Sequence, residues 1–215
     1  NAQRDDDMKL DDIRVGPKLW GTVMGLLIVM LAAAAFTQNR ASVAMVSALE
    51  EVLQKEEAIT RAGQWLGLTQ VVIERTTAAI NVQDPAASKM LSERSAANSA
   101  AITKVQEEVQ KYLITDEEKQ AYEQVGKMHT EALALLKRVP EMKAAGDTEA
   151  MLRFTEQEFT PAANKLLASL EAFIKVEQQA RDAAVVHMHE SRKLAAIFGL
   201  IAAASVADYD TNRIR

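Results

Sequence analysis

The sequence contains no cysteine, only four prolines and eight glycines, and few aromatic residues. Without cysteine the chain can hold no disulfide and no thiolate metal site. The scarcity of proline and glycine, with abundant alanine, glutamate, glutamine, leucine and lysine, disfavours a sheet protein and is typical of long helices. The net charge of −5 gives no electrostatic reason to expect nucleic acid as a partner. The composition therefore predicts an all-α protein.

Residues 19–36, LWGTVMGLLIVMLAAAAF, carry no charge. A helix of that length spans about 27 Å, close to the ~30 Å hydrocarbon core of a bilayer, which predicts a first transmembrane helix. A cleaved secretory signal is the alternative, although the apolar part of such signals is shorter, about 7–15 residues. Arg14 and Lys18 lie just before the run and Arg40 is the first base after it. This excess of bases on the N-terminal side predicts that residues 1–18 form a cytoplasmic tail.

The segments around the run complete the expected domain organisation. Residues 1–7 precede Met8 and are expected to be foreign to the natural chain. Residues 37–193 are expected to form a sensor domain outside the membrane. Residues 194–207, LAAIFGLIAAASVA, are apolar but short for a full crossing, so they predict a second, truncated transmembrane helix. Residues 208–215 are expected to be a tail of non-native origin.

Heptad spacing indicates that the first helix of the sensor domain continues from the membrane helix and runs from about residue 37 to 83. Its apolar residues recur every seven positions: Met45, Val52, Ile59, Leu66, Ile73 and Ile80. Sustained heptads predict a helix in a supercoiled bundle. Asp84-Pro85 closes this helix, because proline disfavours helical geometry in the residue before it.

Three further helices follow. The second is expected from about residue 86 to 113, and Thr115 with Glu118 forms a capping-box signal for the third, which Pro140 and Gly146 bound. The fourth starts near residue 148, and Thr160-Pro161 is expected to interrupt it with a kink or a restart. Thr160 is placed to cap the restarted helix, and Pro161 is suited to its first turn. Short connections force antiparallel neighbours, so we expect an up-down-up-down four-helix bundle whose helices 1 and 4 continue into the transmembrane helices.

A layer of polar residues near the distal end of this bundle is the candidate ligand site. Four positions after successive apolar heptad residues the sequence has Gly63, Gln70 and Thr77. Arg75 is the only cation of the first helix at the depth of this polar layer. The full candidate set is Arg75, Gln70, Thr77, Ser95, Asn98 and Thr160. Arginine grips carboxylates bidentately, which predicts a small organic acid or amino acid as ligand. Alternatively, these groups bond to each other, to water or across a dimer seam.

No motif for catalysis or metal binding is present in the sequence. His187 and His189 are two residues apart and cannot share a helix face, and His129 stands alone. There is no nucleophile motif, acid–base dyad or phosphate-binding loop. We therefore expect no enzyme, no cofactor and no metal.

Several short features occur in an order and spacing that resemble the periplasmic ligand-binding domain of bacterial methyl-accepting chemotaxis proteins, the Tar/Tsr-type chemoreceptors. After the membrane anchor, these are Asp84-Pro85-Ala86, Thr115-Asp116-Glu117-Glu118, Gly146-Asp147, Phe159-Thr160-Pro161 and Lys193-Leu194. The resemblance covers about residues 8–207. The arginine positions of the family's aspartate receptor fall on or near Val72, Thr77 and Asn81, and its threonine on Ala162, so that contact set is missing.

The resemblance implies the sensory half of a homodimeric chemoreceptor in the bacterial inner membrane. Ligand binding in the periplasm would slide helix 4 slightly inward and pass the signal to a cytoplasmic module that is not within these residues. A membrane histidine kinase uses the same kind of sensor and is one alternative. A membrane-anchored structural helical bundle with no small ligand is another.

Overall fold

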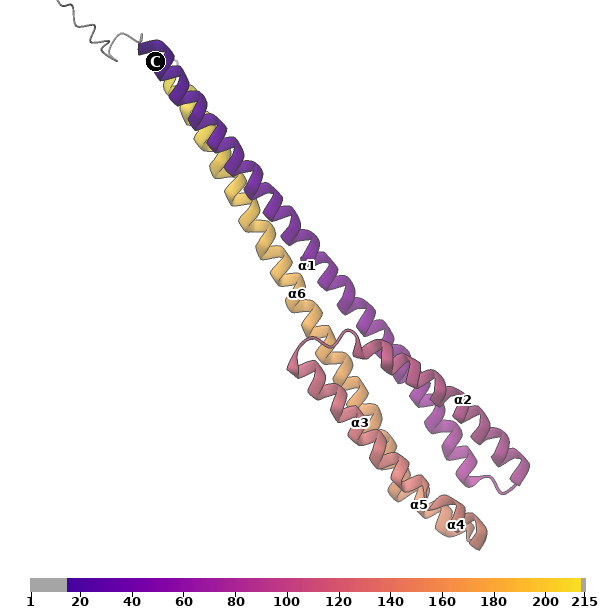
Figure 1. Ribbon diagram of the computed structural model, residues 1–215. Coiled ribbons are helices and arrows are strands. Elements are labelled where there is room, and N and C mark those ends of the chain that lie inside the picture. Colours follow the sequence, from indigo (N-terminus) through magenta and orange to yellow (C-terminus); the bar gives the residue numbers. More distant parts are fainter. Residues whose placement is uncertain (1–14, 214–215) are drawn as a thin grey trace, which may run out of the picture. The chain divides into compact units, whose positions relative to one another are not determined.

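The structure is a computed structural model that describes residues 15–213; predicted tail residues 1–14 and the last two residues lie outside that range. Within it every regular element is helical, which confirms the predicted all-α class. The elements in chain order (Figure 1) are α1 (Val15–Asn81), α2 (Pro85–Gln110), α3 (Asp116–Leu136), α4 (Val139–Ala145), α5 (Thr148–Phe154), the π-helical turn η2 (Thr155–Phe159) and α6 (Thr160–Arg213).

The chain divides into two compact units, to which α1 and α6 both contribute. We call Ala48–Val186 the core unit, and the described residues on either side of it, 15–47 and 187–213, the terminal unit. The unit boundaries follow residues 47 and 186, whereas the predicted domain boundaries follow residues 36 and 193. Each unit is described separately below.

The terminal unit contains the predicted transmembrane run. Its apolar side chains are exposed: Val29, for example, is 66% exposed. α1 is long and apolar enough to cross a membrane, and none of its most apolar window is buried. A signal sequence near the N-terminus meets the same criterion of length and composition. α6 is helical throughout residues 194–207, the predicted second membrane helix, and ends at Arg213.

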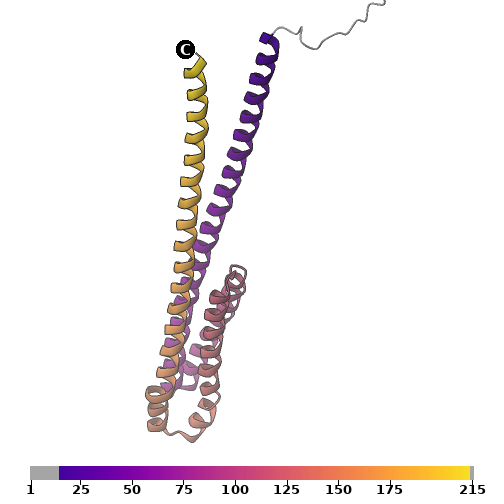
Figure 2. The ribbon, with the colours of Figure 1, turned by 90° about the vertical axis from the view of Figure 1, so that its left-hand side faces the viewer.

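In the core unit α1, α2, α3 and α6 extend in the same general direction (Figure 2). All four contribute to the larger of the two apolar clusters found among the described residues. Trp65 of α1 packs against Tyr122 of α3 and Phe173 of α6, with ring centroids 5.6 and 6.2 Å away. Burial of such aromatic rings and their edge-to-face contacts stabilise the packing of helices. The fully or nearly buried members of the cluster are Ala62, Trp65, Val105, Val109, Val125, Leu166, Leu170 and Phe173.

The face of α1 that points into the core unit differs from the predicted one. The sequence predicted that the residues four positions after each apolar heptad residue also face the core. In the structure, the residues three positions after each heptad residue do so instead. This core lane consists of Ala48, Lys55, Ala62, Thr69 and Thr76, of which the first four are buried, whereas Gly63 and Gln70 of the predicted set are exposed. The predicted apolar heptads lie beside this lane: Ile80 is buried, and Leu66 and Ile73 are half-buried against the core.

The predicted helix ends are confirmed where local chemistry fixes them. Asp84 caps α2 by accepting a hydrogen bond from the Ala86 N–H at 3.0 Å. Thr115 and Glu118 form the predicted capping box at the start of α3. These side chains satisfy N–H groups that a helix leaves without partners at its N-terminus.

The predicted capping role of Thr160 is wrong. Its backbone is helical, with φ −60° and ψ −44°, whereas an N-cap residue has extended geometry. The expected interruption is instead the π-helical turn η2, which ends immediately before Thr160. Pro161 lacks an N–H and its ring conflicts with the carbonyl four residues earlier, so a wider turn at that point accommodates it.

Gly146, after α4, is the one residue with positive φ among those described, at +70°. A side chain disfavours this left-handed conformation by roughly 1–2 kcal/mol. Gly146→Ala should therefore lower the free energy of unfolding by about 1 kcal/mol. Gly126→Ala in α3 is the matched control, because an added Cβ meets no atom within 4 Å at either site. Helix propensity predicts that this control is neutral or stabilising; equal effects in urea unfolding would contradict the assignment.

Candidate functional site

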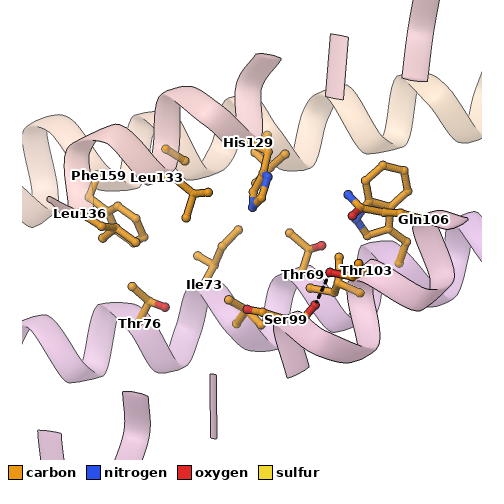
Figure 3. A pocket seen from close by; sticks show the side chains of 15 residues that line it. Thr69, Ile73, Thr76, Ser99, Thr103, Gln106, His129, Leu133, Leu136 and Phe159 are labelled. Atoms are coloured by element: carbon orange, nitrogen blue, oxygen red, sulfur yellow. Dashed lines mark hydrogen bonds between the residues drawn. The ribbon is translucent and has the colours of Figure 1, made fainter. Parts of the chain in front are cut away.

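Two adjoining cavities lie between α1, α2 and α3 in the core unit. The inner cavity, of about 130 Å³, is also bounded by Phe159 and Leu166 (Figure 3). The outer cavity, of about 500 Å³, extends to α4. They adjoin because five residues line both: Val72, Thr76, Ser99, Leu133 and Leu136. Mostly apolar hollows with a few polar groups between helices are typical of small-molecule sites.

Hydroxyl side chains recur at helical spacing along the walls of the two cavities. α1 contributes Thr69 and Thr76, seven residues apart. α2 contributes a row of hydroxyls every three or four residues: Ser88, Ser92, Ser95, Ser99 and Thr103. The facing wall from α3 is mainly apolar: it includes Leu133 and Leu136, together with His129 (Figure 3). The site thus combines hydroxyl groups from α1 and α2 with a mainly apolar wall from α3.

Two of these hydroxyls are buried without a hydrogen-bond partner among the described residues. They are the Oγ1 atom of Thr69 and the Oγ atom of Ser95, in residues that are 5% and 8% exposed. Helical hydroxyls commonly bond to the carbonyl four residues earlier, as Ser99 does to Ser95 O at 3.0 Å and Thr103 to Ser99 O at 3.2 Å. An unpartnered buried polar group costs about 1–3 kcal/mol, and the cavities leave room beside Thr69 and Ser95 for water or another molecule to bond to them.

Lys143 of α4 lines the outer cavity, and its ammonium group is bonded to the protein. The Nζ atom donates to the Ala79 carbonyl and to the Ser88 hydroxyl. The Ser88 hydroxyl in turn donates to the Ala79 carbonyl at 3.1 Å. A lysine at the last carbonyls of a helix stabilises that terminus, so Lys143 anchors α4 to the end of α1.

Of the six predicted site residues, only Ser95 lines either of these two cavities. Arg75 is half-buried, and its guanidinium donates to the Arg94 carbonyl of α2 at 3.3 Å. Gln70 and Thr160 are exposed, so they do not complete an enclosed polar layer with Ser95. The other two, Thr77 and Asn98, are half-buried and line neither cavity.

A buried ion cluster, which the sequence interpretation missed, joins α1, α3 and α6. The Nζ atom of Lys55 lies 2.5 Å from Glu118 Oε1 and 3.7 Å from Glu177 Oε2, and it donates to the Tyr112 carbonyl at 3.1 Å. The three side chains are at most 3% exposed. Glu118 Oε2 accepts from the N–H groups of Ile114 and Thr115, whereas neither oxygen of Glu177 has a hydrogen-bond partner among the described residues.

The two carboxylates of the cluster have opposite pKa shifts. Burial raises the pKa of Glu177 from 4.5 to about 7, the charge of Lys55 opposes this rise, and Glu118 adds to it. Burial also acts to raise the pKa of Glu118, but the bonds from Lys55 and two backbone N–H groups outweigh it and lower the pKa. Above pH 7 the cluster therefore holds two negative charges and one positive charge.

Lys55 belongs to the same α1 lane as Thr69 and Thr76. These three polar residues are spaced by multiples of seven, as core positions of a helical bundle are. That spacing was the sequence feature from which the ion cluster and the hydroxyl groups of the cavities could have been predicted. Polar residues at such positions mark register-fixing or functional sites.

Partial burial lowers the pKa of His129, which lines the inner cavity (Figure 3), below its ordinary value of 6.5.

No protein-family model and no curated protein matches this chain. Within the described residues, no group of three histidine or acidic side chains could hold a metal ion. The function must therefore be argued from the cavities and the sequence.

Proposed function

We propose that this chain is the sensory part of a transmembrane receptor that binds a small molecule inside its core unit. The observation that supports this most strongly is the pair of unpartnered buried hydroxyls, Thr69 and Ser95, which belong to two adjoining cavities. The long apolar part of α1 supports the membrane location.

The four long helices of the core unit are proposed to form an up-down-up-down bundle. Two contacts support antiparallel packing of α1 and α2: Arg75 meets Arg94 near the connecting turn, and Arg61 meets Glu108 farther along, at 3.0 Å. Only residues 82–84 separate α1 from α2, and 111–115 separate α2 from α3. Connections this short favour antiparallel neighbours.

Resemblance to the methyl-accepting chemotaxis proteins gives the proposal its biological setting. The receptor is a homodimer in a bacterial inner membrane, its core unit faces the periplasm, and its output module follows the present residues. A ligand that favours one axial register of α6 shifts the population of that register and so carries the signal. This setting depends on the order of the sequence features and on the bases before residue 19.

Thermal unfolding of the whole chain in lipid nanodiscs, with a panel of small metabolites, tests the proposal. A ligand at one hundred times its Kd should stabilise the native state by about 2.7 kcal/mol. The matched variant is Ser99→Leu, whose larger side chain occupies space in both cavities and should block the ligand. The hydroxyl that it removes is already bonded to the Ser95 carbonyl, so no free hydrogen-bonding group is lost. Stabilisation of the wild type alone supports the sensor. No stabilisation by any metabolite supports the structural-bundle alternative.

A further inference from the structure

We propose that the two cavities accept a small uncharged molecule, with an apolar body and one or two hydrogen-bonding groups, rather than a carboxylate. This inference rests on the proposed function, because it names the class of ligand for that site. It follows from the charge, the free hydroxyls and the size of the cavities.

The walls offer no free charge to a charged ligand. No aspartate or glutamate is among the described residues that line either cavity, so nothing there would pair with an ammonium group. The lining cation, Lys143, donates to Ala79 and Ser88. Arg75, the expected carboxylate partner, instead donates to the Arg94 carbonyl and lines neither cavity. Burial lowers the pKa of His129 and so disfavours a positive charge on its ring.

The free hydrogen-bonding groups are neutral. The hydroxyls of Thr69 and Ser95 come from different helices, and each can donate one hydrogen bond and accept others. A ligand hydroxyl, amide or carbonyl satisfies such a group without bringing a net charge into the protein. A carboxylate would have to give up its hydration for one or two neutral donors, which is strongly unfavourable.

The size of the inner cavity and its apolar wall define the ligand body. An apolar protein cavity of about 150 Å³ holds a benzene ring, and the inner cavity is of comparable size. Its apolar wall includes Ile73, Leu133, Leu136 and Phe159 (Figure 3). A single ring or a short branched chain fits the inner cavity, and its polar substituent can extend toward Ser95 in the outer cavity.

Fluorine NMR of the whole chain in nanodiscs, titrated with para-fluorobenzyl alcohol and with para-fluorobenzoate, tests this inference. The two probes share one ring and differ in charge. We expect the alcohol to bind at least about tenfold more tightly than the benzoate. Thr69→Val and Ser95→Ala should each weaken the alcohol about three- to tenfold. Ser169→Ala on α6, which removes a hydroxyl bonded to Leu166 O, should have no effect.

The outcomes separate the ligand class from the proposed function. Ser99→Leu should abolish binding of the alcohol, and empty nanodiscs supply the correction for partition into lipid. Tighter binding of the benzoate, also lost in Ser99→Leu, would overturn the uncharged class and keep the cavities as the site. If neither probe binds, the inferred class is overturned, and the metabolite panel alone then decides whether the receptor proposal stands.

Discussion

Lys55→Met lowers the free energy of unfolding of the core unit by about 3–5 kcal/mol, because it leaves two buried carboxylates without a cation. Glu118 and Glu177 lie 2.5 and 3.7 Å from the Lys55 ammonium, and the side chains of both are fully buried. Urea unfolding followed by the fluorescence of Trp65 measures the loss. Trp20→Phe removes the other tryptophan, so the signal reports the core unit alone.

Two variants separate loss of charge compensation from loss of the lysine side chain. Lys104→Met, at an exposed position of α2, should change stability by no more than about 0.5 kcal/mol. Lys55→Met combined with Glu118→Gln and Glu177→Leu removes all three charges and should recover most of the lost stability, because a buried ion cluster is often replaceable by neutral groups. If the triple variant is as unstable as Lys55→Met alone, charge compensation is not the cause.

The core unit should become more stable as the pH falls from about 7 toward 4.5. Burial raises the folded-state pKa of Glu177 to about 7, above its ordinary value of 4.5. Between these values the folded state binds one proton more than the unfolded state, so the free energy of unfolding falls as pH rises and levels off above about 7. The lowered pKa of Glu118 acts in the opposite direction only when pH falls below its ordinary value. The lowered pKa of His129 also acts in the opposite direction, below its ordinary value of 6.5, and offsets part of the Glu177 effect.

Glu177→Gln should remove this dependence, because the amide has the shape of the neutral acid. At about pH 8 the variant should be more stable than the wild type by about 2–3 kcal/mol, and near pH 4.5 the difference should vanish. The same urea unfolding, repeated across the pH range, measures both curves. Glu171→Gln, an exposed position on α6, is the control. A parallel pair of curves for Glu177→Gln and the wild type would contradict the raised pKa.

Local chemistry made part of this fold predictable from sequence. Asp84 before Pro85 and the Thr115–Glu118 box act within a few residues, so their signals need no knowledge of the tertiary structure. The composition was likewise sufficient for the all-α class. The prediction that Thr160 caps a helix was wrong because it also used only local sequence. The π-helical turn η2 keeps the chain helical up to Thr160 and Pro161, so no new helix begins there.

The candidate site could not be found in the same way, because it depends on which α1 lane faces inward. The lanes three and four residues on from the apolar heptads contain similar residues, such as Thr69 beside Gln70 and Thr76 beside Thr77. Packing of Trp65 against α3 and α6 fixes the rotation of α1. Thr69 is therefore buried while Gln70 is exposed, and Thr76 rather than Thr77 lines the two cavities. The ion cluster and Lys143 depend in addition on the relative positions of several helices, which no local pattern contains.

Methyl NMR of the whole chain in nanodiscs, with the metabolite that stabilises it most, tests the location of the binding site directly. The methyl groups of Val72, Ile73, Leu133 and Leu136, which line the inner cavity, should shift in proportion to occupancy. Those of Ile114 and Leu152, which line neither cavity, should stay in place. Shifts confined to methyl groups outside the cavities, with these four unchanged, would show that the hollow between α1, α2 and α3 is not where this protein binds its ligand.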